Sequence, residues 1–203
     1  MYQLQERSSI FGKMLQPFIN FDRQLFQLIN QQWSNSLLDA LMPFIRNQYT
    51  WVPLYLFLLA LVLVNFRAKG LWWALFFLAT FALTDLISAQ LFKPFFERLR
   101  PCNDAFTAPG ARMLIPCSGS FSFVSNHAAN HFGMAMYMFL TMKNFAKPWI
   151  WLAFVWAVLV AWAQVYVGAH FPLDVAGGAL VGMAAGKFSS HHYLRQFGGL
   201  KTA

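Results

Sequence analysis

The chain has 203 residues, of which 58% are hydrophobic and 11% are charged, whereas about a quarter of the residues in a soluble domain are charged. This composition excludes an ordinary water-soluble protein and indicates one that is solvated mainly by lipid. The formal net charge is +8, but the 15 Lys and Arg residues are dispersed singly or in pairs between apolar runs. Because a nucleic-acid-binding surface clusters its basic residues, we expect no nucleic-acid partner.

The N-terminal part of the chain is amphipathic rather than continuously apolar. Residues 24–47 carry apolar side chains at helical spacing, interrupted by Asp39, Pro43 and Arg46. This pattern favours helices that lie in the membrane interface. A sixth, imperfect membrane crossing within 24–47 is the alternative.

Five later stretches are apolar enough to span a membrane: residues 51–66, 71–92, 125–142, 149–168 and 173–187. Several are shorter than the ~20 residues that a perpendicular helix needs, so their ends must extend into flanking polar residues. The last stretch contains Gly178, Gly182 and Gly186 at four-residue spacing, which predicts close packing against another helix. We therefore predict an all-α integral membrane protein, a bundle of five to six transmembrane helices with N-terminal amphipathic helices.

The basic residues distinguish the two sides of this bundle. With five crossings, one side carries seven basic and no acidic residues, namely Arg67, Lys69, Lys143, Lys147, Lys187, Arg195 and Lys201. By the positive-inside rule this side is cytoplasmic. The chain is then a single domain, residues 1–203, with an N-terminal amphipathic segment (1–50), a transmembrane core (51–190) and a cytoplasmic tail (191–203).

The opposite side breaks the positive-inside rule, since it carries Lys93, Arg98, Arg100 and Arg112. Cations retained there need another role, and binding an anion supplies one. The two cysteines of the chain, Cys102 and Cys117, lie in the same outer segment. We predict that they form a disulfide, with two free thiols as the alternative.

Polar residues gather at the outer ends of the second and third spans. Lys93 and Arg100 follow the second span, where the two cations can neutralise phosphate oxygens, Arg through its bidentate fork and Lys as a point charge. Ser125 precedes a helical apolar pattern and is predicted to be an N-cap, with Asn126 and His127 next in the chain. The unpaired N–H groups of that helix would then point outward at an anion.

Two further ionisable residues lie at the start of the last span. His170 comes just before Pro172, a residue that favours the first position of a helix, and Asp174 lies in the first turn. Asp174 can hold one ring nitrogen of His170 and leave the other to attack phosphorus, while His127 protonates the leaving oxygen. Together these groups are the parts needed for phosphoryl transfer through a covalent histidine intermediate.

These residues resemble the three motifs of the type 2 phosphatidic acid phosphatase superfamily of membrane lipid phosphatases. The first motif, Lys, six residues, Arg-Pro, is matched by KPFFERLRP at 93–101. The second, Pro-Ser-Gly-His, is similar to VSNH at 124–127. The third, Ser-Arg, five residues, His, three residues, Asp, is matched by AQVYVGAHFPLD at 163–174 except at its first two positions.

The resemblance implies a helical membrane fold, a phosphohistidine intermediate and no metal or other cofactor. Because these residues lie on the side opposite the seven basic residues, the positive-inside rule predicts an active site on the periplasmic face of the inner membrane. The partners would be the bilayer and a lipid phosphate substrate such as undecaprenyl diphosphate, phosphatidylglycerol phosphate, phosphatidic acid or lipid A. The catalytic residues would be His170, His127 and Asp174, and the phosphate-binding residues Lys93, Arg100, Ser125, Asn126 and Gln164.

The third motif is incomplete in this chain. Ala163 and Gln164 stand where the motif has Ser and Arg, which removes a cation that the family uses on the phosphate. Gln164 can donate hydrogen bonds, but neutral donors form bonds about half as strong as charged ones. We therefore expect Arg98 or Arg112 to supply the missing charge.

Alternative functions remain open at this point. A lipid phosphotransferase would use the same residues, and a non-enzymatic lipid-phosphate binding or transport protein would tolerate Gln164. His127 and His131 are four residues apart on one helix face, which is also a metal-ligand spacing. Asp85 lies inside the second span, where we expect it to hydrogen-bond another helix. The sequence predicts no oligomeric state.

Overall fold

The structure, a computed structural model, describes residues 10–200, with side chains from residue 14 onward. Residues 1–9 of the expected N-terminal segment and residues 201–203 of the expected tail, including Lys201, lie outside the described residues. Within the described range every regular element is a helix, as the sequence predicts.

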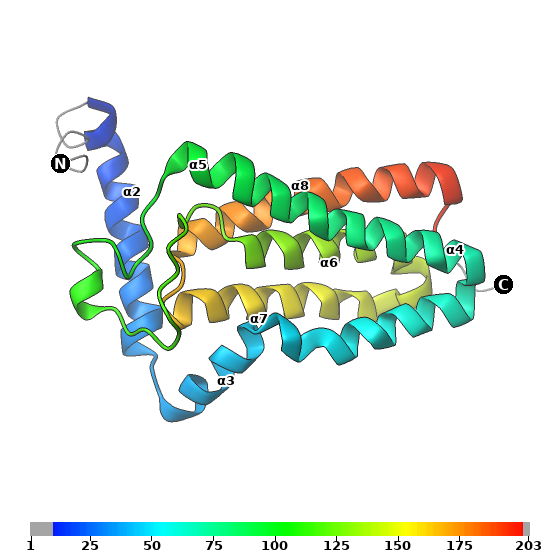
Figure 1. The fold of residues 1–203 in the computed structure, drawn as a ribbon, viewed down its shortest axis with the longest axis horizontal. Helices are drawn as coiled ribbons and strands as arrows, with labels where there is room; N and C mark the ends of the chain where they lie inside the picture. The colour runs from blue at the N-terminus through cyan, green and yellow to red at the C-terminus, as the bar shows by residue number, and fades with distance from the viewer. Residues whose placement is uncertain (1–9, 201–203) are drawn as a thin grey trace.

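The N-terminal part forms two amphipathic helices joined by a break. α2 (Ile10–Gln27) lies across one end of the bundle and continues into the π-helix η1 (Leu28–Gln32) (Figure 1). α3 (Ser36–Arg46) then packs against α7. Asn35 caps α3, because its side-chain oxygen accepts a hydrogen bond from the Leu38 backbone N–H at 3.0 Å and so satisfies a helix-start donor.

The next helical run folds back on itself. The 3₁₀ turn η2 (Gln48–Trp51) leads into α4 (Val52–Leu86), and within α4 the chain reverses at Arg67, whose φ is +48° (Figure 1). A Cβ at Gly70 would lie 2.1 Å from a backbone carbonyl oxygen of the outgoing segment. Only glycine therefore allows the two segments to approach so closely at the turn.

After the reversal, α4 leads toward the end of the bundle that α2 crosses. It continues through the π-helix η3 (Ile87–Phe92) into the short helix α5 (Lys93–Phe96), which ends at Glu97 in a left-handed conformation. Because π-helical turns widen the backbone and change the direction of side chains, η3 sets where Lys93 points. An irregular loop follows, with one 3₁₀ turn, η4 (Ala108–Gly110).

The centre of the bundle consists of α6 (Asn126–Ala146), α7 (Leu152–Tyr166) and α8 (Pro172–Phe197). The chain reverses between α6 and α7 at Lys147, whose φ is +49°, and passes through the 3₁₀ helix η5 (Lys147–Trp151). α6 packs against α4, α7 and α8. It is therefore the helix that the others surround.

The predicted glycine stripe forms the interface between α6 and α8. A Cβ at Gly182 would lie 2.1 Å from the carbonyl oxygen of Ala129, and one at Gly178 would lie 2.6 Å from the carbonyl oxygen of Ser125. Side chains larger than hydrogen would force the two helices apart. The contact reaches the first residues of both helices, so it places the start of α6 beside the start of α8.

Two described helical runs are long and apolar enough to cross a membrane, Gln48–Phe96 and Asn126–Tyr166. The first run reverses direction at Arg67 and the second at Lys147, so each consists of two long helical segments. With α8, the described part of the bundle has five long helical segments. Large apolar side chains on α4 face outward; Val64 is 78% exposed and Leu78 is 61% exposed. Such a surface suits contact with lipid. The number of membrane crossings, five or six, stays a prediction.

Replacing Gly182 with Ala tests whether close helix packing holds the bundle together. We expect Gly182→Ala to destabilise the protein by about 1–3 kcal/mol, because the added methyl group overlaps the backbone of α6. The measurement is thermal unfolding of the protein purified in detergent. Gly119→Ala is the matched control, since a Cβ there meets no atom within 4 Å. Equal melting temperatures for the two variants would contradict the prediction.

Candidate active site

A cavity of about 260 Å³ lies at the end of the bundle that α2 crosses. Helices α3, α5, α6 and α7 and the loops that precede α6 and α8 contribute its walls. Among the described residues that line it, we find three cations and two imidazoles but no carboxylate. The polar lining side chains belong to Arg46, Lys93, Arg100, Ser118, Asn126, His127, Gln164 and His170. A cavity with this lining favours an anion.

Six of the eight predicted site residues line this cavity: Lys93, Arg100, Asn126, His127, Gln164 and His170. The other two lie behind its wall. Ser125 is fully buried and caps α6 by accepting a hydrogen bond from the Ala128 N–H at 3.5 Å. Asp174 is fully buried in the first turn of α8. The structure therefore gives Ser125 and Asp174 positioning contacts rather than a surface on the cavity.

The hydrogen bonds around His170 define its tautomer. The Ser122 hydroxyl oxygen lies 2.5 Å from Asp174 Oδ2 and 3.2 Å from His170 Nδ1. Because a carboxylate can only accept, Ser122 donates to Asp174 and accepts the Nδ1 proton. On the other side of the ring, Arg100 Nη1 lies 3.3 Å from Nε2. Since a guanidinium can only donate, Nε2 carries the lone pair, as a nucleophile requires.

From the sequence we expect Asp174 to contact His170 directly, but in the structure Ser122 bridges the two. His170 Nδ1 and Asp174 Oδ2 are 3.7 Å apart, which is too long for a hydrogen bond. His170 itself lies in the loop between α7 and α8, outside the spanning helices. Burial there lowers the pKa of its imidazole to about 4, although Asp174 acts in the opposite direction. The ring is therefore neutral at pH 7.

Asp174 is held in place from a second direction. Its Oδ1 accepts a hydrogen bond from Arg98 Nη1 at 2.6 Å, and Arg98 also pairs with Asp22 of α2. Asp22 in turn accepts the backbone N–H of Leu173 at 2.8 Å. This network ties α2 to the start of α8, and the carboxylate that faces Ser122 cannot rotate without breaking it.

The expectation that Arg98 or Arg112 supplies the charge missing at Gln164 is wrong. Arg98 is committed to two carboxylates, and Arg112 Nη2 lies 2.6 Å from Asp39 Oδ2. The cation beside Gln164 is Arg46, whose Nε lies 3.4 Å from Gln164 Oε1. In the sequence Arg46 is only an interruption of an amphipathic pattern, and nothing local indicates that it reaches the cavity.

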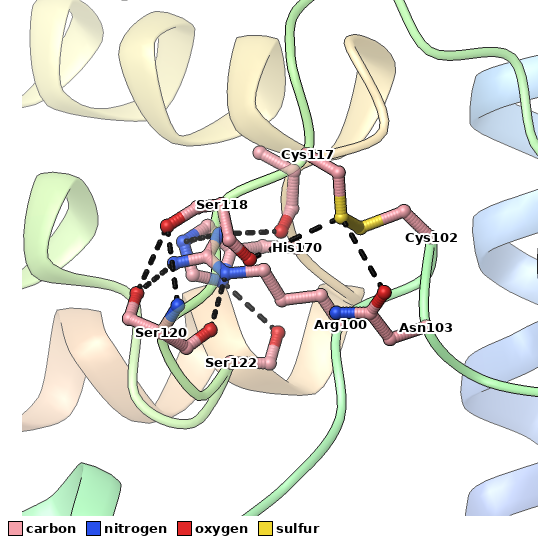
Figure 2. The surroundings of a disulfide bond; sticks show 9 residues. Arg100, Cys102, Asn103, Cys117, Ser118, Ser120, Ser122 and His170 are labelled. Atoms are coloured by element: carbon pink, nitrogen blue, oxygen red, sulfur yellow. Dashed lines mark hydrogen bonds between the residues drawn. A yellow bond between two sulfur atoms is a disulfide. The ribbon is translucent and has the colours of Figure 1, made fainter.

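A disulfide joins Cys102 to Cys117 at one edge of the cavity, with their Cα atoms 6.2 Å apart. The loop that it closes leads directly to Ser120, which holds Arg100. Arg100 Nε donates to the Ser120 carbonyl oxygen at 2.7 Å, and Nη2 donates to the Ser120 hydroxyl at 2.9 Å. Figure 2 shows the Arg100 side chain with its partners Ser120 and His170, near the disulfide. The loop therefore fixes the guanidinium against the imidazole.

The remaining polar residues of α6 have distinct surroundings. His127 lines the cavity, whereas His131 Nδ1 lies 2.8 Å from the His127 carbonyl oxygen and its ring packs against Trp156. The Asn126 side chain donates to Asp85 at 2.7 Å, which confirms that Asp85 hydrogen-bonds another helix. Among residues 10–200, no group of three or more His, Cys, Asp or Glu side chains has the arrangement of a metal site.

An all-helical bundle with a lipid-facing surface, and with three cations around a neutral histidine at one end, defines a membrane protein suited to phosphoryl transfer. Comparison with known proteins identifies its family. The model of the PAP2 superfamily matches residues 70–197. The chain therefore belongs to the PAP2 superfamily and is a membrane lipid phosphatase, as its motifs imply.

Individual relatives support this assignment. The chain is 31% identical over 181 residues to lipid A 4'-phosphatase of Bacteroides thetaiotaomicron, a match that covers 83% of this chain and 75% of that protein. It is 32% identical over 180 residues to undecaprenyl-diphosphatase of Sulfolobus acidocaldarius, covering 86% and 80%. The fold is similar to the crystal structure of a transmembrane PAP2 type phosphatidylglycerolphosphate phosphatase from Bacillus subtilis, with a TM-score of 0.66, 24% identity and coverage of 88% and 87%.

Removing the Ser122 hydroxyl tests the bridge between His170 and Asp174. We expect Ser122→Ala to lower kcat/KM for phosphate release by about 10–100-fold, since a hydrogen bond to a charged group contributes about 1.5–3 kcal/mol. Ser190→Ala is the matched control, because Ser190 is also buried and hydrogen-bonded but lies in the far part of α8. If both variants kept the rate of the unmodified protein, the bridge would have no role in catalysis.

Proposed function

We propose that the chain hydrolyses a phosphate or diphosphate ester of a membrane lipid through a phosphohistidine on His170. The observation that carries this proposal is the position of His170 Nε2. This nitrogen bears the lone pair, lies 3.3 Å from Arg100 and belongs to a residue that lines the cation-walled cavity. A phosphoryl group bound by the cations would therefore meet an unprotonated nucleophile.

In the first step, the Nε2 lone pair attacks phosphorus while the bond between phosphorus and the leaving oxygen breaks. Protonated His127 gives its proton to that oxygen, and a bound phosphate dianion stabilises the protonated ring beforehand. The His170 ring becomes positively charged as the phosphorus–nitrogen bond forms. Asp174 stabilises this charge through Ser122, much as a buried carboxylate stabilises the imidazolium of a serine triad.

In the second step, water attacks the phosphohistidine and neutral His127 accepts the proton of that water. The phosphorus–nitrogen bond breaks, inorganic phosphate leaves and His170 returns to its neutral form. Lys93 and Arg100 neutralise the phosphoryl oxygens in both steps. The unpaired backbone N–H groups at the start of α6, beside Asn126, add donors that carry a partial positive charge.

We further propose that the active site faces the periplasm, in a chain that crosses the inner membrane five or six times. The described basic residues Arg67, Lys143, Lys147 and Arg195 lie at chain reversals or in the last turns of helices, at the opposite end of the bundle. Because basic residues favour the cytoplasmic side, this distribution supports a site on the outer side.

The relatives support a substrate class. Their names specify lipid A 4'-phosphate and undecaprenyl diphosphate, which share a phosphoryl group at the membrane surface and a large apolar anchor. We propose a substrate of this kind. The cavity of about 260 Å³ would take up the phosphoryl group itself, while the acyl or prenyl chains remain in the bilayer.

Phosphate release from a panel of lipids tests the proposed reaction. The purified protein should release inorganic phosphate from at least one of lipid A, undecaprenyl diphosphate, phosphatidylglycerol phosphate and phosphatidic acid, and a chelator should not reduce the rate. Labelled phosphate that moved to a second lipid without being released would identify a phosphotransferase instead. Protein that bound these lipids without changing them would indicate a binding or transport function.

Trapping the intermediate tests the role of His170. With substrate labelled on the transferred phosphate, rapid quenching in alkali should leave label on the protein that acid removes, as a phosphoramidate bond requires. His170→Ala should carry no label and should lose at least about 10³-fold in turnover, because a missing nucleophile removes the whole covalent route. Label that survived in His170→Ala would place the nucleophile elsewhere.

A further inference from the structure

Arg46 reaches the active site from a helix outside the three motifs. It is the last residue of α3, and α3 packs along α7, the helix that carries Gln164. The Arg46 Nε donates to Gln164 Oε1 at 3.4 Å, and both residues line the cavity together with His127 and His170.

Within residues 14–200, three arginines at this end of the bundle are paired with carboxylates, but Arg46 is not. Arg23, Arg98 and Arg112 each contact a carboxylate at 2.6 Å or closer. No carboxylate lies within 4.0 Å of Arg46 in the described part of the chain, although its side chain is partly buried. A partly buried cation without a counter-ion is unfavourable, so this site lacks an anion that a phosphate group would supply.

Gln164, on the same wall of the cavity, also lacks a partner for one of its polar groups. Its side chain is fully buried, and its Nε2 donor has no hydrogen-bond partner in the part of the chain that the structure describes. Leaving a buried amide donor unpaired costs free energy that most proteins avoid. Oε1 already accepts from Arg46. The Nε2 of Gln164 and the Nη groups of Arg46 are therefore donors for which residues 14–200 supply no hydrogen-bond acceptor.

We propose that Arg46 is the third phosphate-binding cation of this active site and takes the place of the arginine that the third motif has at position 164. This inference rests on the proposed function and deepens it. Gln164 holds Arg46 through Oε1 and donates to the phosphate through Nε2. Arg46, Lys93 and Arg100 then supply three positive charges to a phosphoryl group whose negative charge spreads over three equatorial oxygens in the transition state.

If Arg46 had only a structural role, moving its charge to position 164 would not restore activity. A cation in the last turn of α3 also stabilises the helix dipole, and that role depends on position 46 alone. A phosphate-binding role depends on positive charge at one point in the cavity, which residue 46 or residue 164 can supply. Moving the charge between the two positions therefore distinguishes the two roles.

The test compares Arg46→Gln, Gln164→Arg and the double variant that carries both changes. We expect Arg46→Gln to lower kcat/KM for lipid phosphate hydrolysis by about 10–100-fold, which is the loss of one charged hydrogen-bonding group. Inhibition by orthovanadate, a mimic of the phosphoryl transition state, should weaken by a similar factor. The double variant should recover to within about 3-fold of the unmodified protein. Gln164→Arg alone should gain nothing, because it places a second guanidinium beside Arg46.

Two controls make the result specific. Arg195→Gln removes a charge from the far end of α8 and should change neither kcat/KM nor vanadate inhibition. Arg46→Met removes the charge but retains an unbranched side chain of similar length. It replaces Arg46→Gln in the test if thermal unfolding shows that Arg46→Gln does not fold.

Two results would overturn the inference: unchanged activity and vanadate inhibition in Arg46→Gln, or a loss that a folded double variant does not recover. Failure of the proposed function looks different, because the unmodified protein would then hydrolyse no more lipid phosphate than His170→Ala.

Discussion

The close contact between α6 and α8 is the constraint on which the rest of the site depends. Helix backbones approach this closely only where the side chain is a hydrogen atom, and Gly178 and Gly182 provide that space. The contact continues to the helix starts, where the Ser125 N–H donates to the Asp174 carbonyl oxygen at 3.0 Å. Two helix starts that are distant in sequence therefore form one surface. The residues of the second and third motifs meet there because the helices cannot separate.

Charges at this end of the molecule fall into two groups with different surroundings. Arg98 is paired with two carboxylates, so its charge is balanced within the protein. These ion pairs hold Asp174 in place. The cations on the cavity wall, Arg46, Lys93 and Arg100, have no carboxylate within 4.0 Å among the described residues. Pairing one group of cations and leaving the other unpaired keeps the cavity selective for anions. It also keeps the neighbouring carboxylates away from the cations that line the cavity.

The sequence predicts the parts of this molecule that depend on local pattern. Apolar runs, the N-cap at Ser125 and the glycine stripe follow from spacing within one helix, and the structure contains all three. It does not predict Ser122, Asp22 or Arg46, because their partners lie 48 to 151 residues away and no periodic pattern indicates them. A serine in a polar loop and an arginine at the end of an amphipathic helix resemble ordinary surface residues. Their importance comes from tertiary contacts that only the folded chain reveals.

The incomplete third motif illustrates why a motif and a site are different things. A phosphoryl group requires positive charge at certain points in space, and this requirement does not specify which helix carries the charge. In this chain the position on α7 holds Gln164, while α3 brings a guanidinium to the same wall from 118 residues away in sequence. A guanidinium on one helix can take the place of one on another only where the two helices pack side by side at the cavity, as α3 and α7 do. The amide then gains a use that an arginine would not have, because its oxygen accepts from the neighbouring guanidinium and its nitrogen remains available as a donor. The departure from the motif is therefore compatible with a site that retains three cations.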